Sequence, residues 1–448
     1  MLRTAREMGE RLMEGPEVAP AGAARSNEEL RLAAIVGRVI DTRQVTTVFQ
    51  PLVDLSTTEI VGYEAFCRGP AGSEVESPLA LLEGAHLAGR LAEFDWMCAA
   101  RACEAVIKAQ LHPSMTIFVN IKPATILEPC PEDLRPAVYE AQNRLRIIVD
   151  MNEESLTDDP GSLFDAVRAV REAAWGISID DAAVAPAALA LLPLVRPDVL
   201  KLDFRSVKGQ MPEIAEMGDG ARIYSEQTGA TILAQGIEDT DDVWAARLAG
   251  ATFGQGWHFG RPGPLPRERV VPTSVFPLVQ PPPVVDRSTP FEIITSSCKP
   301  TITEKRFLVP FSHHIEEQVD RNGPRALLLE TFESKSGKHA GTHARLRQLE
   351  NRGAFLAVLS ADMTSTTMVG PTVRTGQLAP DDPLAREWNV IVLGPHYAVA
   401  VTARGLDDPA AGDNRRFEYV VTHDRDLIVR AAFVLWARIP KREPTLSA

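Results

Sequence analysis

Residues 231–260 read TILAQGIEDTDDVWAARLAGATFGQGWHFG and contain two apolar β-type runs with a helical segment between them. The runs are TILAQGI and TFGQGWHFG, and the helical segment is DTDDVWAARLAG. Strands that alternate with helices along a chain form βαβ units, whose strands lie parallel in one sheet. This stretch therefore predicts an α/β fold. The polar residue Gln235 lies near the end of the first run, and Glu238 and Asp239 follow it, at the point where such a strand ends.

The same alternation extends toward the N-terminus. Further β-type runs are, in chain order, TTVFQPLVDL, IVGYEAFC, TIFVNI, LRIIVDM, WGISID and VLKLD. About eight strands in about 240 residues are typical of a TIM-like (β/α)8 barrel. The first two runs are joined only by a few residues around STTE, which is a hairpin connection. We therefore expect an α/β barrel in which one strand is antiparallel to its neighbours.

The composition predicts further segments on either side of the barrel. Residues 1–28 are polar and rich in alanine and glycine, which predicts a flexible tail before a barrel over 29–265. Residues 266–300 contain many prolines, which remove backbone donors and block helix formation, so we expect an extended linker. Apolar periodicity resumes in runs such as NVIVLG, AVAVTA and FEYVVT. They predict a smaller α/β (α+β) domain over 301–442.

Charge and cysteine content exclude several classes of protein. The chain has 448 residues and a formal net charge of -13, which repels a phosphate backbone and argues against nucleic-acid binding. The five cysteines are scattered and form no C-x-x-C pair, which fits a reducing cytoplasm rather than a disulfide framework or a zinc site. No run of about 18 apolar residues appears, so no membrane insertion is expected. These features predict a cytoplasmic protein.

Polar side chains stand at or near the C-terminal end of most of the β-type runs. They are Glu64, Asn120, Asp150, Asp180, Asp181, Lys201, Asp203, Gln235, Glu238 and Gln255. In a parallel barrel these ends share one rim, where such barrels build their active sites. A single polar strand end is explained by contact with solvent, but carboxylates on several strands favour a site. Carboxylate and amide oxygens suit Mg²⁺ or Mn²⁺, and two such ions can bind a phosphodiester and activate water.

Eight short motifs in order resemble the EAL domain, a barrel family that hydrolyses cyclic di-GMP to linear pGpG. They are FQPLVDL, GYEAFCR, FVNI, IIVDMNEESL, SIDD, LKLD, AQGIED and GQGWHFGRP. The metal ligands that this resemblance implies are Glu64, Asn120, Asp150, Asp180 and Asp181. The ligand-binding residues that it implies are Gln50, Arg68, Glu238, Gln255 and Pro262. The catalytic positions that it implies are Lys201, Asp203 and Gln235.

Three departures from the family pattern affect catalysis. Gln235 replaces the glutamate proposed as general base, and a neutral amide cannot accept a proton at working pH. Losing a general base costs about 10²–10⁴-fold in rate. Asp150 replaces a metal-binding glutamate with a shorter side chain, although Mg²⁺ demands near-ideal geometry. The loop DDAAVAP replaces a glycine-containing loop, and Ala183 and Ala185 cannot adopt positive φ cheaply.

The C-terminal region resembles, more loosely, the DICT domain, a sensory module found beside cyclic di-GMP enzymes and two-component domains. The matching pieces include FSHHIEE, RALLLETFES and LAREWNVIVLGPHYAVAVTARGL. Four histidines of this region invite a metal interpretation, His313, His314, His339 and His343. They lack an H-E-x-x-H motif and a cysteine partner, so we expect surface residues rather than a metal site.

These features predict a bacterial cyclic di-GMP signalling protein. Its degenerate EAL barrel would act as a receptor or regulatory scaffold with little or no hydrolysis. The first alternative is an active metal-dependent phosphodiesterase giving pGpG, and the second is a protein-interaction module that binds no nucleotide. The expected cofactor is Mg²⁺ or Mn²⁺ if metal binding survives. The expected partners are cyclic di-GMP, a second copy in a homodimer and an unidentified protein, with no nucleic acid and no membrane.

Overall fold

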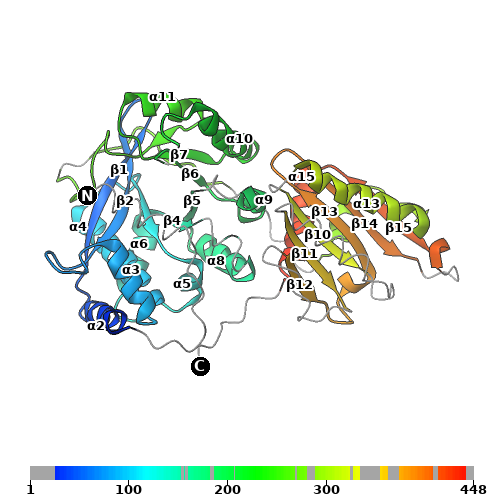
Figure 1. The fold of residues 1–448 in the computed structure, drawn as a ribbon, viewed down its shortest axis with the longest axis horizontal. Coiled ribbons are helices and arrows are strands. Elements are labelled where there is room, and N and C mark those ends of the chain that lie inside the picture. Colours follow the sequence, from blue (N-terminus) through cyan, green and yellow to red (C-terminus); the bar gives the residue numbers. More distant parts are fainter. Residues whose placement is uncertain are drawn as a thin grey trace.

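The computed structural model describes residues 26–439 apart from 153–155, 157–159, 182–185, 206, 268–269, 280–287, 323–325, 333–353, 362–372 and 407–411. The described residues form a closed barrel and a second domain built on a seven-stranded sheet (Figure 1). This arrangement confirms the predicted TIM-like barrel with a smaller C-terminal α/β domain.

Eight strands close the barrel in chain order. They are β1 (Thr46–Asp54), β2 (Ile60–Arg68), β3 (Thr116–Asn120), β4 (Arg146–Asn152), β5 (Gly176–Asp180), β6 (Val199–Asp203), β7 (Thr231–Gln235) and β8 (Phe253–Gly254). Strand β1 runs antiparallel to both β2 and β8, and the other neighbouring pairs are parallel. The single reversed strand agrees with the predicted hairpin. The C-terminal ends of β2 to β8 therefore share one rim.

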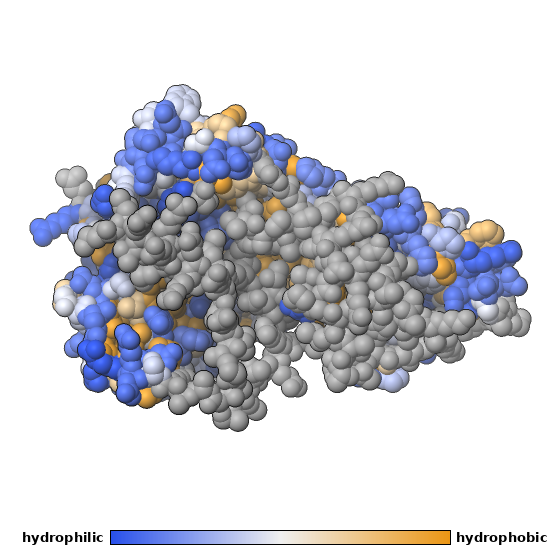
Figure 2. Space-filling model, viewed as in Figure 1, coloured by the Kyte–Doolittle hydropathy of each residue, from blue (hydrophilic) through white to orange (hydrophobic). Residues whose placement is uncertain are grey.

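Helices surround the barrel strands. They are α2 (Asn27–Asp41), α3 (Pro78–Leu87), α4 (Leu91–Ala109), α5 (Pro123–Leu127), α6 (Arg135–Arg144), α8 (Pro160–Glu172), α9 (Pro186–Val195), α10 (Met211–Thr228) and α11 (Thr240–Leu248). Helix α2 begins after Ser26, whose side chain forms a reciprocal capping box with Glu29. The face formed by α10 and α11 is largely hydrophilic in the view of Figure 2.

A phenylalanine from beyond the last strand fills the barrel interior at the end opposite the rim. Phe276 is fully buried, and its ring centroid lies 5.1 Å from that of Phe118 and 4.2 Å from that of Phe253. Arg146, at the start of β4, donates to the Phe276 carbonyl at 2.8 Å. Asp198, just before β6, accepts from the Val279 N–H at 2.5 Å. These hydrogen bonds hold the segment around Phe276 against the N-terminal ends of the barrel strands.

The second domain has the strand order β12-β11-β10-β13-β14-β15-β9. The strands are β9 (Thr301–Glu304), β10 (Leu327–Phe332), β11 (Phe355–Ser360), β12 (Val373–Gln377), β13 (Glu387–Leu393), β14 (Ala398–Gly405) and β15 (Arg416–Thr422). The pairs β10–β11 and β11–β12 are parallel, and the other pairs are antiparallel. One sheet face packs on α13 (Lys305–Asn322), and the other packs on α12 (Pro290–Thr295) and α15 (Arg425–Trp436).

Helix α15 joins the two domains. The Phe433 ring lies 4.8 Å from the Phe164 ring of α8, and the Trp436 ring lies 5.8 Å from the same ring. Gln227, in α10, donates to the Pro395 carbonyl at 3.2 Å. The barrel helices α8 and α9 face the second domain (Figure 1). The contact therefore falls on the helices that flank β5.

Replacing Phe276 tests whether this residue is part of the barrel core. We expect Phe276→Ala to lower the free energy of unfolding of the barrel by about 3–5 kcal/mol, because it leaves a cavity in a packed interior. Urea unfolding followed by circular dichroism measures this change. Val275→Ala is the matched control, since Val275 is 41% exposed. Equal midpoints for the two variants would contradict the assignment.

Candidate functional site

A buried lysine lies at the centre of the barrel rim. The Lys201 side chain is fully buried, and its Nζ lies 3.0 Å from Glu64 Oε2 and in contact with Asp150 Oδ2. Burial alone would lower the pKa of Lys201, but the charges of Asp150 and Glu64 outweigh it and raise that pKa above its usual value. Lys201 is therefore an ammonium ion held between two buried carboxylates.

Gln235, the last residue of β7, bridges Lys201 and Asp180, the last residue of β5. With its amide nitrogen toward Asp180 Oδ1 at 2.7 Å, its amide oxygen accepts from Lys201 Nζ at 3.2 Å. This orientation satisfies both neighbours, because a carboxylate needs a donor and an ammonium needs an acceptor. A glutamate at the same position would set a second carboxylate against Asp180. Gln235 is thus a bridge between two charged groups and has no basic atom for water activation.

Two further glutamines, Gln255 and Gln50, form a chain of hydrogen bonds that begins at Glu64. Gln255 Nε2 donates to Glu64 Oε2 at 2.8 Å and to Gln50 Oε1 at 3.2 Å. Gln50 Nε2 in turn donates to the Gly260 carbonyl at 3.1 Å. Both glutamines are more than nine-tenths buried. The structure gives them internal partners, and their predicted contact with a ligand stays a prediction.

Two cations that the motifs did not single out hold the outer carboxylates. Arg205 Nη2 lies 2.6 Å from Asp203 Oδ2, and Lys208 Nζ lies 3.1 Å from Glu238 Oε2. The signal for them in the sequence is their position in LKLDFRSVK, directly after the strand that carries Lys201 and Asp203. Asp203 and Glu238 are therefore each paired with a cationic side chain.

The remaining predicted residues lie around this centre. Asn120 is exposed at the end of β3, and its Nδ2 lies 3.4 Å from Glu64 Oε1. Arg68 ends β2 and donates to the Cys67 carbonyl at 3.0 Å. Asp181 follows β5 with φ of 53°, and Pro262 lies beyond β8, where both side chains are at least partly exposed. The altered loop at 182–185, with Ala183 and Ala185, lies outside the described residues.

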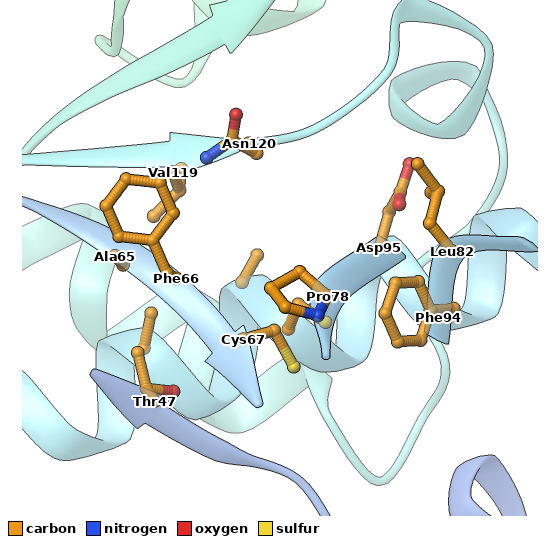
Figure 3. Close-up of a pocket in the computed structure, with 13 residues that line it drawn as sticks. Thr47, Ala65, Phe66, Cys67, Pro78, Leu82, Phe94, Asp95, Val119 and Asn120 are labelled. Carbon is orange, nitrogen blue, oxygen red and sulfur yellow. The ribbon is translucent and has the colours of Figure 1, made fainter. Parts of the chain in front are cut away.

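A cavity of about 250 Å³ opens beside Asn120 between β2 and α4 (Figure 3). Phe66 and Cys67 come from the strand, and Phe94 and Asp95 come from the helix. The lining is mainly apolar, and Asn120 supplies an amide at its edge. Burial raises the pKa of Asp95, while hydrogen bonds from Thr125 and the Lys122 N–H oppose this rise. The cavity is therefore a small, mainly apolar space with a polar group at its edge.

The residues predicted to bind metal share the rim but do not surround a common point. Within the described ranges, no three histidine, cysteine or acidic side chains are placed to hold a metal ion. Lys201 lies between Glu64 and Asp150, so an ammonium fills the space that their oxygens face. Asp150 Oδ1 is buried without a hydrogen-bond partner among the residues described, but one oxygen is not a coordination shell. The space between Glu64 and Asp150, occupied by this ammonium, does not fit Mg²⁺ or Mn²⁺.

The structure places two of the four histidines that the sequence analysis named. His313 and His314 are exposed on α13, as predicted, whereas His339 and His343 lie outside the described residues. In the part of the chain that the structure describes, no helix combines the length and apolar character needed to cross a bilayer.

Comparison with curated proteins gives relatives that match about half of this chain. The probable cyclic di-GMP phosphodiesterase PdeB of Escherichia coli is 28% identical over 239 residues, which cover 51% of this chain and 44% of that protein. The oxygen sensor protein DosP of Escherichia coli is 23% identical over 269 residues, covering 58% of this chain and 33% of that protein. The chain therefore spans less than half the length of these curated relatives.

Solved structures and family models were compared as well. The EAL domain of Xanthomonas citri FimX in complex with c-diGMP is 19% identical with a TM-score of 0.45, covering 53% of this chain and 95% of that chain. Residues 291–406 match the model of DICT, the sensory domain in diguanylate cyclases and two-component system. Residues 30–262 match the model of the EAL domain. Because that match spans more than half of the 448 residues, the chain belongs to the EAL domain family.

Proposed function

We propose that this chain is a cyclic di-GMP signalling protein whose EAL barrel binds the dinucleotide with little or no hydrolysis. It would act as a receptor or regulatory scaffold beside its DICT domain. The observation that carries this proposal is the bridging role of Gln235, which stands at the position of the family's general base and contacts Asp180 and Lys201 instead. The names of curated relatives as phosphodiesterases support the choice of dinucleotide.

Binding is supported by the groups that the rim and its cavity offer. Cyclic di-GMP presents two anionic phosphates and two flat purine bases. Arg68, Arg205 and Lys208 are cations at or near the rim, and guanidinium groups pair well with phosphate oxygens. The cavity beside Asn120 has aromatic walls and an amide, which suit a purine base.

Hydrolysis requires a group that takes a proton from the attacking water. Gln235 cannot do so, Asp180 accepts a hydrogen bond from the Gln235 amide, and three further acidic groups of the rim have cationic partners. Arg205 binds Asp203, and Lys201 binds Glu64 and Asp150. Breaking such a pair to free a base leaves a charge without its counter-ion, which adds to the barrier. These contacts favour a receptor over a working phosphodiesterase.

Binding and turnover measured on the same preparation test the proposal. We expect calorimetric titration of the full chain to give heat of binding with cyclic di-GMP. We also expect pGpG formation, followed by chromatography with Mg²⁺ and with Mn²⁺, to lie at least about 10²-fold below an active EAL phosphodiesterase, because the general base is absent. Rapid pGpG formation would establish the phosphodiesterase alternative. A folded chain that gives no heat would favour the interaction module.

Restoring the glutamate tests whether Gln235 alone prevents turnover. We expect Gln235→Glu to leave pGpG formation within about threefold of the unmodified chain, since Asp150 is still paired with Lys201 and the new carboxylate faces Asp180. Gln142→Glu, on α6 away from the rim, is the matched control for added charge. The assay is the same chromatography. Activity equal to that of an active family member would show that Asp150 and the loop at 182–185 are no obstacle.

A further inference from the structure

Arg205 contacts two neighbouring residues at the rim, Asp203 and Gly236. Its Nε lies 2.9 Å from each Asp203 oxygen, and its backbone N–H donates to Asp203 Oδ1 at 2.8 Å. Its aliphatic stem lies over Gly236, where an added Cβ would meet Arg205 Cγ at 2.5 Å. Gly236 has φ of +76°, a conformation that favours glycine. The absence of a side chain at Gly236 therefore leaves room for the stem of Arg205.

Two side-chain cations thus form ion pairs with carboxylates of the rim. Lys201 is paired with Glu64 and Asp150 in the buried half of the rim. Arg205 is paired with Asp203 in the exposed half. The hydrogen bond to Asp203 raises the pKa of Arg205, and the charges of Asp203, Asp181 and Asp180 add to this rise. Partial burial opposes it. Two of the acidic residues that the family resemblance assigns to metal, Glu64 and Asp150, therefore face an ammonium, and the catalytic position Asp203 faces a guanidinium.

The outer edge of the Arg205 guanidinium remains open to solvent. Its side chain is 69% exposed, and its Nη1 donates to no residue within the described part of the chain. A guanidinium has five N–H donors in a planar fork that matches the oxygens of a phosphate. Arg205 can therefore keep Asp203 on one edge and bind an anion on the other.

We propose that Lys201 takes the place of a divalent cation between Glu64 and Asp150, and that Arg205 binds a phosphate of cyclic di-GMP in the absence of metal. The inference rests on the proposed receptor function and names the contact through which the rim binds its ligand. It follows from two observations: Lys201 already occupies the space between Glu64 and Asp150, and Arg205 pairs with Asp203 while one edge of its guanidinium stays open to solvent. Metal is then needed neither to neutralise these carboxylates nor to attract the dinucleotide.

Calorimetric titration of the full chain with cyclic di-GMP in EDTA and in Mg²⁺ tests this inference. We expect dissociation constants within about threefold of each other in the two buffers. We expect Arg205→Gln to weaken binding about 10-fold or more in both, because it removes a charge-assisted hydrogen bond to phosphate. Arg205→Lys keeps the charge without the planar fork, so it should restore part of the affinity.

Arg168→Gln is the matched control, because Arg168 is 64% exposed and pairs with Asp165 at 2.8 Å on the outer surface of α8. We expect it to bind like the unmodified chain, and circular dichroism confirms that each variant is folded. Binding that is lost in EDTA and restored by Mg²⁺ would overturn the inference while leaving the receptor function intact. Unchanged affinity in Arg205→Gln would also overturn it. No binding in either buffer would overturn the receptor function and this inference together.

Discussion

The barrel rim depends on one buried ion cluster, the Lys201 ammonium between Glu64 and Asp150. Removing a charge from water costs several kcal/mol unless close counter-charges and hydrogen bonds replace the lost hydration. The two carboxylates supply the counter-charge, and the amides of Gln235 and Gln255 complete the hydrogen bonds. Four strands are thereby connected through side chains at one point. Two acidic residues of the rim, Glu64 and Asp150, thus hold this lysine.

The second domain contacts the barrel beside the strand that carries Asp180. Helices α8 and α9 flank β5, and both contact the second domain through α15 or β10. Phe164 packs between the rings of Phe433 and Trp436, so the contact is apolar and aromatic. The opposite end of the barrel is closed by Phe276. Strand β5 therefore carries Asp180 at the rim and lies between the two helices that contact the second domain.

The sequence predicted the barrel well because alternating strands and helices are a local, repeated signal. The hairpin before Glu64 was readable for the same reason, and strand ends placed the polar residues on one rim. The partners of those residues could not be read. The stem of Arg205 packs over Gly236, where a side chain would collide with it. Phe276 returns to the barrel from a proline-rich stretch that suggests only extended chain. Such contacts depend on tertiary packing rather than on residue order.

The central claim is that side-chain cations, rather than metal ions, neutralise this rim. Electron paramagnetic resonance of Mn²⁺ titrated into the full chain, with cyclic di-GMP present, measures the free ion directly. The account predicts that the free Mn²⁺ signal is the same with and without protein. Depletion of free Mn²⁺ in proportion to the protein, abolished by Asp180→Asn, would contradict it.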